Sequence, residues 1–183
     1  HKTKAADATR NTSGVVLNIF AEKIPALVGG SADLTGSNKT WLNCSKAYTP
    51  QNPENRYIHF GVREHAMVAI GNGLEAYGGI IPFTATFFNF IEYAYGAVRL
   101  SALSPHKHIL VMTHDSIGLG EDGPTHQPIE AFALCRATPN MLTFRPADAN
   151  EVSGAYAIAL QHKGPSVLCL SRQNVDHLPT SSP

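Results

Sequence analysis

The sequence has few charged residues, and its charges cancel. Fourteen Lys and Arg balance fourteen Asp and Glu, so the formal net charge is zero, and charged residues make up only 15% of the chain. An average domain has about 25%. A zero net charge argues against a general nucleic-acid binder, which presents a strongly basic surface. So low a charge content favours a protein whose surface is partly covered by a partner.

Cysteines and long apolar runs are also scarce. Cys44, Cys135 and Cys169 are far apart and form no CxxC pair, which argues against a disulfide framework and favours a reducing compartment. We expect the cytoplasm, with an organelle left open as the alternative. No apolar run approaches the roughly 18 residues of a membrane span. The chain begins with His1 rather than Met, so we expect it to be a piece of a longer protein.

Helix-like and strand-like segments alternate along the whole chain. Apolar residues at three- and four-residue spacing predict helices over residues 9–23, 64–77, 88–103, 128–136 and 149–162. Short apolar runs predict strands over residues 26–30, 57–60, 80–84, 108–113, 141–145 and 166–170, with mostly loop over 31–55. Asp148 should cap the last helix, with Glu151 completing a capping box. The alternation predicts a single α/β domain over residues 1–183, with a mostly parallel central sheet and helices on both faces.

Polar residues that follow the predicted strands are the first candidates for a site. Ligands of parallel α/β sheets bind at the carboxyl ends of the strands. The residues found there are Ser31 and Asp33, Gly61 and Glu64, Thr86, His114 and Asp115, and Ser171 and Arg172. Several of them fall on one edge of the sheet, so we expect one polar site.

An acid and three aromatic residues each allow a structural and a functional interpretation. Glu64 lies in the first turn of a predicted helix, where the helix dipole stabilises an anion by about 0.3–1 kcal/mol. This is the structural interpretation of Glu64, and the functional one is a buried acid that points toward a ligand. Phe87, Phe90 and Tyr93 recur every three residues, which places them within about 120° on one helix. They form either a core stripe or a wall for a planar ring. The pattern alone favours the structural interpretation in both cases.

The segment from His114 to His126, HDSIGLGEDGPTH, is the most informative in the chain. It gathers two histidines and three acids among three glycines, directly after the most hydrophobic strand. Loops need glycine for positive φ but seldom concentrate so many titratable groups, so the pattern favours function. The GEDG run with Asn150 is similar to the magnesium-diphosphate signature of thiamine enzymes, but Glu121 interrupts it. No spacing typical of zinc is present either, so we predict no metal ligands.

Arg10, Ser37 and Arg172 are isolated signals. An isolated arginine is usually solvated or salt-bridged on the surface, and no G-x-S-x-G motif accompanies these residues. The residue pattern alone therefore assigns them no function.

Together, these segments resemble the middle, pyrimidine-binding domain of transketolase. The stretches that carry the resemblance are ATR at 8–10, GGSADLTGSN at 29–38, GVREHAM at 61–67, TFFNFIEY at 86–93, THDSIGLGEDGPTHQP at 113–128, RPAD at 145–148 and LSRQN at 170–174. They follow the family's order and cover nearly the whole chain, apart from residues 42–55. The match at HDSIGLGEDGPTHQP is very specific and outweighs the structural interpretations above.

The resemblance implies thiamine diphosphate chemistry. Transketolases move a two-carbon ketol unit from a ketose phosphate to an aldose phosphate in the pentose phosphate pathway. Glu64 would hydrogen-bond the ring nitrogen of the cofactor's aminopyrimidine, and its sharing of a proton there would activate the thiazolium carbon. Phe87, Phe90 and Tyr93 would surround the aminopyrimidine, and Asp33 would lie near the cofactor and the subunit interface.

The resemblance also implies contacts with the substrate. His114 and Asp122 would hydrogen-bond hydroxyls of the sugar, and we count His114 with Glu64 as catalytic. Arg10, Ser37 and Arg172 would hold the substrate phosphate, for which arginine offers bidentate and permanently charged donors.

The family's diphosphate and metal site lies in an amino-terminal domain that this chain lacks, and its carboxy-terminal domain is lacking too. The resemblance implies a homodimer, with each complete site between the pyrimidine domain of one subunit and the diphosphate domain of the other, which holds magnesium or calcium. We therefore expect the chain alone to be inactive. The expected partners are sugar phosphates and the second subunit, with no nucleic acid and no membrane.

Two alternatives remain at this point. The nearest enzyme, 1-deoxy-xylulose-5-phosphate synthase, shares the fold and the glutamate but is expected to differ at GEDGPTHQP and TFFNF. A non-catalytic assembly module of the same fold is the other alternative. A non-catalytic module would be expected to have lost some of the site residues, but Glu64, the arginines and the loop histidines are all present.

Overall fold

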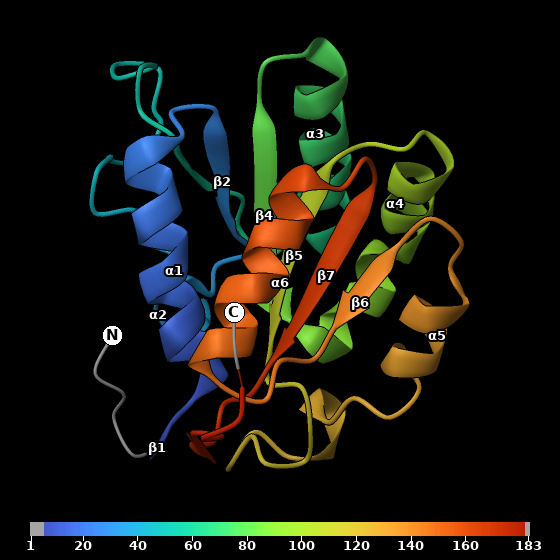
Figure 1. The fold of residues 1–183 in the computed structure, drawn as a ribbon. Helices are drawn as coiled ribbons and strands as arrows, with labels where there is room; N and C mark the ends of the chain where they lie inside the picture. The colour runs from blue at the N-terminus through green and yellow to red at the C-terminus, as the bar shows by residue number, and fades with distance from the viewer. Residues whose placement is uncertain (1–5, 182–183) are drawn as a thin grey trace.

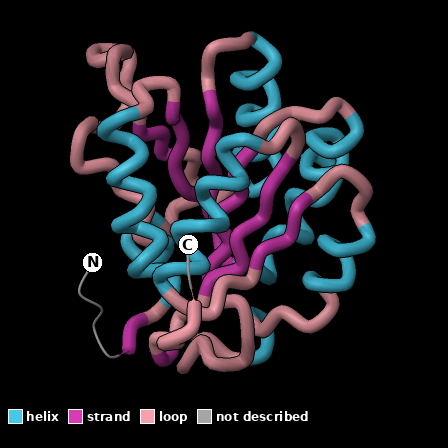
Figure 2. Tube along the Cα trace, viewed as in Figure 1, coloured by secondary structure: helices cyan, strands magenta, loops and turns pink. Residues whose placement is uncertain are grey.

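The computed structural model describes residues 6–181, which form a central sheet between two layers of helices (Figures 1 and 2). The sheet has six parallel strands in the order β3-β2-β4-β5-β7-β6. Their bounds are β2 Leu27–Ser31, β3 Tyr57–His59, β4 Ile81–Phe87, β5 His108–Thr113, β6 Leu142–Phe144 and β7 Pro165–Leu170. The predicted α/β fold with a parallel sheet is confirmed.

Helices pack on both faces of this sheet, as predicted. Helices α1 (Thr9–Lys23) and α6 (Ala149–Gln161) lie in front of the sheet in Figure 1, and α3 (Glu64–Tyr77), α4 (Ile91–Leu103) and α5 (Ala131–Ala137) lie behind it. None of the helices in the described part of the chain is both long and apolar enough to cross a membrane.

Strand β5 shows why the centre of the sheet is apolar on both sides. All six of its residues are buried. Ile109 and Val111 contribute to the core shared with α1 and α6, whereas Leu110 and Met112 contribute to the core shared with α3, α4 and α5. Successive side chains of a strand point to opposite faces, so a strand covered on both sides requires a continuous apolar run.

The junction between β4 and α4 differs from the sequence-based prediction. The strand expected to end at residue 84 continues to Phe87. The helix expected from residue 88 begins as a 3-10 turn, Phe88–Phe90, before α4 starts at Ile91. The apolar run is continuous across this junction, and a continuous run does not mark where a strand gives way to a helix.

Several short elements were not predicted. Helix α2 (Thr35–Asn38) and the 3-10 turn η2 (Pro124–His126) lie in segments expected to be loop. Strands β1 (Ala6–Asp7) and β8 (Val175–Asp176) pair antiparallel, which brings the two ends of the described chain together. Elements of two to four residues are too short to produce a periodic pattern, and β1 and β8 depend on pairing between distant segments.

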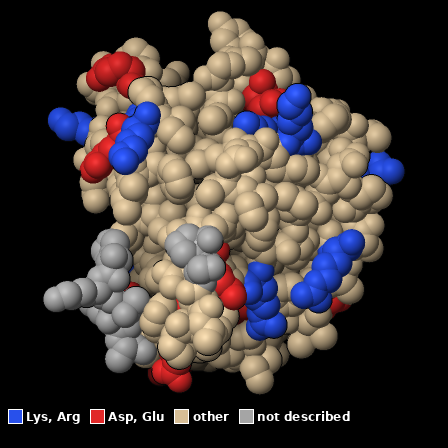
Figure 3. Space-filling model, in the orientation of Figure 1, with Lys and Arg blue, Asp and Glu red and all other residues tan. Residues whose placement is uncertain are grey.

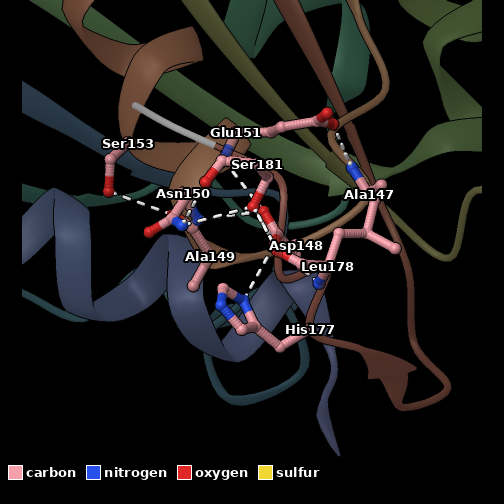
Figure 4. A network of polar contacts seen from close by, with 9 residues as sticks. All are labelled: Ala147, Asp148, Ala149, Asn150, Glu151, Ser153, His177, Leu178 and Ser181. Atoms are coloured by element: carbon pink, nitrogen blue, oxygen red, sulfur yellow. Dashed lines mark hydrogen bonds and ion pairs between the residues drawn. The ribbon is translucent and has the colours of Figure 1, made fainter. Parts of the chain in front are cut away.

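Asp148 caps α6 as expected, but the capping box is shifted by one residue (Figure 4). One oxygen of its carboxylate accepts hydrogen bonds from the backbone N–H groups of Asn150 and Glu151. The Glu151 carboxylate accepts from the backbone N–H of Ala147, 2.7 Å away, rather than from that of Asp148. The other oxygen of Asp148 accepts from the backbone N–H of Leu178. The cap therefore also holds the segment that follows β8.

The same contacts keep Asp148 charged. Burial raises the pKa of its carboxyl group, but hydrogen bonds from the Ser181 hydroxyl and from the N–H groups of Glu151 and Leu178 outweigh burial and lower the pKa below its usual value. His177 Nδ1, 2.9 Å from the carboxylate, acts in the same direction. A buried carboxylate thus joins α6 to the end of the described chain.

Two glycines of α3 have opposite surroundings. A Cβ at Gly71 would lie 2.3 Å from Cε1 of the His108 ring, whereas a Cβ at Gly73 would meet nothing within 4 Å. The His108 ring is fully buried and cannot easily move, because Thr84 Oγ1 lies 2.9 Å from its Nε2 and Asn72 Oδ1 lies 3.1 Å from its Nδ1. Gly71 therefore provides space that the buried imidazole needs.

We predict opposite effects of alanine at these two glycines. Gly71→Ala should lower the free energy of unfolding by about 2 kcal/mol or more, because the added methyl group displaces the held His108 ring. Gly73→Ala should raise it by about 0.5–1 kcal/mol, because alanine loses less backbone entropy in a helix. Urea denaturation measures both changes, and equal effects at the two positions would contradict the packing described.

Candidate functional site

The carboxyl ends of the strands meet at one edge of the sheet, the lower edge in Figure 1. Ser31 ends β2, Phe87 ends β4, Thr113 ends β5 and Leu170 ends β7, and these four strands run parallel. The loop after β5, drawn in yellow, lies at this edge. The expected convergence of strand ends is therefore present, and the predicted site residues can be located relative to it.

A pocket of about 750 Å³ is formed at the start of α3, the junction of β4 with α4, and the end of the loop after β5. It is lined by Val62, Arg63, Glu64, His65, Ala66, Phe90, Tyr93, Thr125 and His126. Glu64, the first residue of α3, thus borders the same space as two aromatic rings. Arg63, His65 and Thr125 were not predicted, although they are sequence neighbours of Glu64 and His126.

The three predicted aromatic residues form one row, but they do not lie on one helix. Phe87 ends β4, Phe90 ends the 3-10 turn, and Tyr93 lies in the first turn of α4. The ring centroids of Phe87 and Phe90 are 5.8 Å apart, and those of Phe90 and Tyr93 are also 5.8 Å apart. Tyr93 is 69% exposed. The row is therefore a wall that reaches the surface rather than a core stripe.

His114 has a strained backbone directly after β5. Its φ is +62°, a left-handed conformation that costs a residue other than glycine about 1–3 kcal/mol. Its imidazole lies on the Phe87 ring, with centroids 3.8 Å apart and planes inclined by 27°. Burial lowers the pKa of His114 to about 4, and the nearby charge of Arg10 contributes to this lowering. The imidazole is therefore neutral near pH 7.

The predicted polar residues gather around this imidazole. The Asp122 carboxylate lies 4.0 Å from His114 Nε2. Arg10 donates a hydrogen bond from Nη1 to the backbone oxygen of Ser37, 3.2 Å away. The charges of Arg10, Asp122 and Arg172 all influence the pKa of His114. Five predicted residues from four separate segments therefore form one cluster.

The two arginines of this cluster are suited to an anion. Burial and the charge of Arg172 lower the pKa of Arg10, whereas Asp122 raises it. Arg172 packs over Gly120, where a Cβ would lie 3.2 Å from Cζ of the guanidinium group. Nε of Arg10 is buried and has no hydrogen-bond partner within residues 6–181. Two guanidinium groups placed together can hold the oxygens of a phosphate or carboxylate.

Asp33 lies outside the pocket. It is exposed and does not line the pocket. Its φ is +60°, so its backbone has the same left-handed strain as that of His114, two residues after the end of β2. The structure therefore places Asp33 at the edge where the strands end, outside the lining of the pocket.

Sequence reasoning missed the contacts that hold the loop after β5. Nε of Arg145 donates a hydrogen bond to Oδ2 of the buried Asp115 at 2.7 Å, and Cζ of Arg145 lies 4.6 Å from the centroid of the Phe132 ring. Nδ2 of Asn89 donates to the backbone oxygen of Thr125 at 2.8 Å. The hydrogen-bonded partners are 30 and 36 residues apart in the chain, so no local pattern could pair them.

The fold and the site define a class: a parallel α/β domain whose pocket is bordered by an acid and aromatic rings and whose strand ends carry a pair of arginines. The family model described as transketolase, pyrimidine binding domain, matches residues 6–177. The chloroplast transketolase-1 of Arabidopsis thaliana is 57% identical over 178 residues, which are 96% of this chain and 24% of that protein.

Solved structures agree with the family match. A transketolase from Leishmania mexicana has a TM-score of 0.97 at 55% identity, covering 100% of this chain and 28% of that one. A Pichia stipitis transketolase in complex with sedoheptulose 7-phosphate has a TM-score of 0.96 at 51% identity, covering 98% of this chain and 28% of that one.

The chain therefore belongs to the transketolase family, in which it corresponds to the pyrimidine-binding domain. It spans about a quarter of the length of these relatives. The resemblance seen in the sequence is confirmed. The synthase alternative receives no support from these matches.

We predict that charge changes around His114 shift its pKa in opposite directions. Asp122→Asn removes a carboxylate that raises this pKa and should lower it, whereas Arg172→Gln removes a cation that lowers this pKa and should raise it. An NMR titration of the imidazole Cε1 proton measures both shifts, with His114→Gln identifying the resonance. Shifts of equal sign in the two variants would contradict the cluster.

Proposed function

We propose that this chain supplies the aminopyrimidine half of a thiamine diphosphate site in a transketolase. The intact enzyme would transfer a two-carbon ketol unit from a ketose phosphate to an aldose phosphate, in the pentose phosphate pathway. The observation that carries the proposal is the pocket in which Glu64 and the rings of Phe90 and Tyr93 border one space. Membership of the transketolase family supports this chemistry.

The residues of the pocket fit an aminopyrimidine ring. A flat heteroaromatic ring packs favourably against aromatic side chains, and Phe90 and Tyr93 provide them. When bound, the cofactor supplies the carbon that carries the ketol unit between sugars. Glu64 would hold and share a proton at the ring nitrogen, and the aromatic wall would fix the plane of the ring and exclude water from one of its faces.

The arginine cluster fits a sugar phosphate. Arg10 and Arg172 would hold the phosphate by charged hydrogen bonds, and Ser37, whose backbone oxygen accepts from Arg10, would add a hydroxyl. His114 is neutral and can donate one hydrogen bond to a sugar oxygen, while the Asp122 carboxylate can accept from a sugar hydroxyl. The Pichia stipitis relative was solved with sedoheptulose 7-phosphate, which supports sugar phosphates as the substrate class.

We also propose that the chain is one domain, residues 1–183, of a longer cytoplasmic protein. It covers about a quarter of the length of its relatives. Within residues 6–181, no group of three or more His, Cys, Asp or Glu side chains is arranged to hold a metal ion. The diphosphate and its magnesium or calcium would then be held by an amino-terminal domain, and a carboxy-terminal domain would complete the protein.

A second subunit of a homodimer would provide the other half of the site. Val62 and Tyr93, which line the pocket, are 73% and 69% exposed, and Tyr77 at the end of α3 is 87% exposed. The surface is also poor in charge: the centre of the face over α1 and α6 shows few charged side chains (Figure 3). Both features support a domain that is covered by other parts of its protein.

We predict that Glu64 is required for activity of the full-length protein with thiamine diphosphate and magnesium. Glu64→Ala should lower kcat/KM for ketol transfer by about a hundredfold or more, equivalent to about 3 kcal/mol of transition-state stabilisation. Glu92→Ala is the matched control, because Glu92 also lies in the first turn of a helix but does not line the pocket. It should retain nearly full activity.

The outcomes of this assay separate the candidate functions. If Glu64→Ala nearly matches the wild type, the role given to Glu64 is wrong, although the family assignment stands. If the wild type binds the cofactor and shows no ketol transfer, the non-catalytic module of the same fold is favoured.

We predict that the 183-residue chain alone is inactive. It contributes contacts to the aminopyrimidine but none to the diphosphate, so calorimetric titration should give a thiamine diphosphate Kd weaker than about 1 mM, which corresponds to a binding free energy of roughly −4 kcal/mol. The full-length protein serves as the positive control. Tighter binding by the chain alone, or any ketol transfer by it, would show that the site is complete within these residues.

A further inference from the structure

A line of buried hydrogen bonds leads from β2 to His114. Ser31, Asn38 and Thr113 are each 0% exposed. Ser31 Oγ donates to Asn38 Oδ1 at 2.6 Å, and Asn38 Nδ2 donates to Thr113 Oγ1 at 2.7 Å. Thr113 Oγ1 in turn lies 2.9 Å from His114 Nδ1. The line therefore connects β2, α2 and β5 to the imidazole of the arginine cluster.

The contacts of Ser31 determine which group donates and which accepts along this line. Ser31 Oγ accepts from the backbone N–H of Leu34 at 3.1 Å, so its own hydrogen is available for Asn38 Oδ1. If the Asn38 amide were turned around, Ser31 would accept twice and its buried hydroxyl hydrogen would have no acceptor within residues 6–181. Buried polar groups are rarely left without a partner. The Asn38 amide nitrogen therefore faces Thr113.

The Thr113 hydroxyl accepts a hydrogen bond from Asn38 and therefore donates its own hydrogen to the imidazole. Its oxygen accepts from Asn38, and the other hydrogen bond of this hydroxyl within residues 6–181 is the one to His114 Nδ1. The single hydroxyl hydrogen of Thr113 is therefore directed at Nδ1. A neutral imidazole carries one hydrogen, which must then be on Nε2.

We propose that Asn38 is a positioning residue that sets the tautomer of His114, so that Nε2 carries the hydrogen and can donate it to an oxygen of the substrate. The inference rests on the function proposed above, in which His114 contacts a sugar phosphate. Its basis is the hydrogen-bonded line from Ser31 through Asn38 and Thr113 to Nδ1.

Other contacts of His114 agree with this assignment. The Asp122 carboxylate lies 4.0 Å from Nε2, and a negative group is better placed opposite an N–H than opposite a nitrogen lone pair. Burial and the charge of Arg10 keep the ring neutral by lowering its pKa, so the position of one hydrogen decides whether Nε2 donates or accepts. The stack on Phe87 fixes the plane of the ring but does not distinguish its two nitrogens.

Asn38→Asp tests the proposal with a side chain of the same shape. A carboxylate at this position still accepts from Ser31, but it also accepts from the Thr113 hydroxyl, because it has no hydrogen to donate. The Thr113 oxygen is then free to accept from Nδ1–H, which moves the hydrogen of His114 from Nε2 to Nδ1. Thr113→Ser, which keeps the hydroxyl, is the matched control for this change.

The first measurement reads the tautomer directly and does not depend on activity. Long-range proton–nitrogen correlation spectra of the 183-residue chain, labelled with ¹⁵N-histidine, distinguish the protonated from the unprotonated nitrogen, and His114→Gln identifies the signals. We expect Nε2–H in the wild type and in Thr113→Ser, and Nδ1–H in Asn38→Asp. An Nδ1–H tautomer in the wild type, or an unchanged Nε2–H tautomer in Asn38→Asp, would overturn the proposal.

The second measurement reads the consequence in the full-length enzyme. Loss of one donor to a charged or polar substrate oxygen should raise the KM of Asn38→Asp for the ketose phosphate about tenfold to a hundredfold, while the affinity for thiamine diphosphate stays unchanged. Thr113→Ser should keep a KM close to that of the wild type. A KM for Asn38→Asp equal to that of the wild type would count against the proposal. So would a loss of thiamine diphosphate affinity in Asn38→Asp as large as the rise in its KM. If the wild type shows no ketol transfer but the tautomer changes as expected, the proposed function fails and the role of Asn38 stands.

Discussion

The parallel pairing of β4 with β5 sets Phe87 beside Thr113, and both parts of the site depend on this register. The residue after Thr113, His114, turns over the Phe87 ring at a centroid distance of 3.8 Å. On the other side, the chain leaves Phe87 directly into the turn that brings Phe90 to 5.8 Å from it. Phe87 thus lies between Phe90, which lines the pocket, and the His114 imidazole of the arginine cluster. A register shift of one residue would turn alternate side chains to the opposite face and separate the two parts.

This edge of the sheet holds strained backbone because the core beneath it is rigid. The left-handed conformation of His114 costs about 1–3 kcal/mol, and it follows a strand whose six residues are all buried. The next residue, Asp115, is fixed on two sides: its N–H donates to the backbone oxygen of Leu170 at 3.2 Å, and its carboxylate accepts from Arg145 at 2.7 Å. The strained residue therefore lies between a strand ladder and an ion pair, and neither neighbour can relax without loss of buried contacts.

The parts of this fold that follow from local patterns could be predicted from the sequence. The bounds of β5, α1 and α3 agree with the observed ones, because HILVMT is a run required by a strand buried on both faces and the two helices have regular apolar spacing. The end of β4 could not be located within a continuous apolar run. The supports of the site were beyond prediction because they join distant residues: Asn38 and Thr113 are 75 positions apart. The roles of Glu64 and the arginines came from the family resemblance, since their local patterns favoured a structural interpretation.

The hydrogen bond from Thr113 can set the tautomer of His114 only because the surrounding charges and burial keep the imidazole neutral. A protonated imidazole would donate from both nitrogens, and the direction of the Thr113 hydroxyl would then make no difference to Nε2. Burial and the neighbouring arginines prevent this by lowering the pKa of His114 to about 4. The positive charge beside the imidazole is thereby left to Arg10 and Arg172, and the imidazole becomes a neutral group whose single hydrogen is set by its neighbours. Only under this condition can Asn38, a residue fully buried behind the site, determine whether His114 donates a hydrogen bond or accepts one.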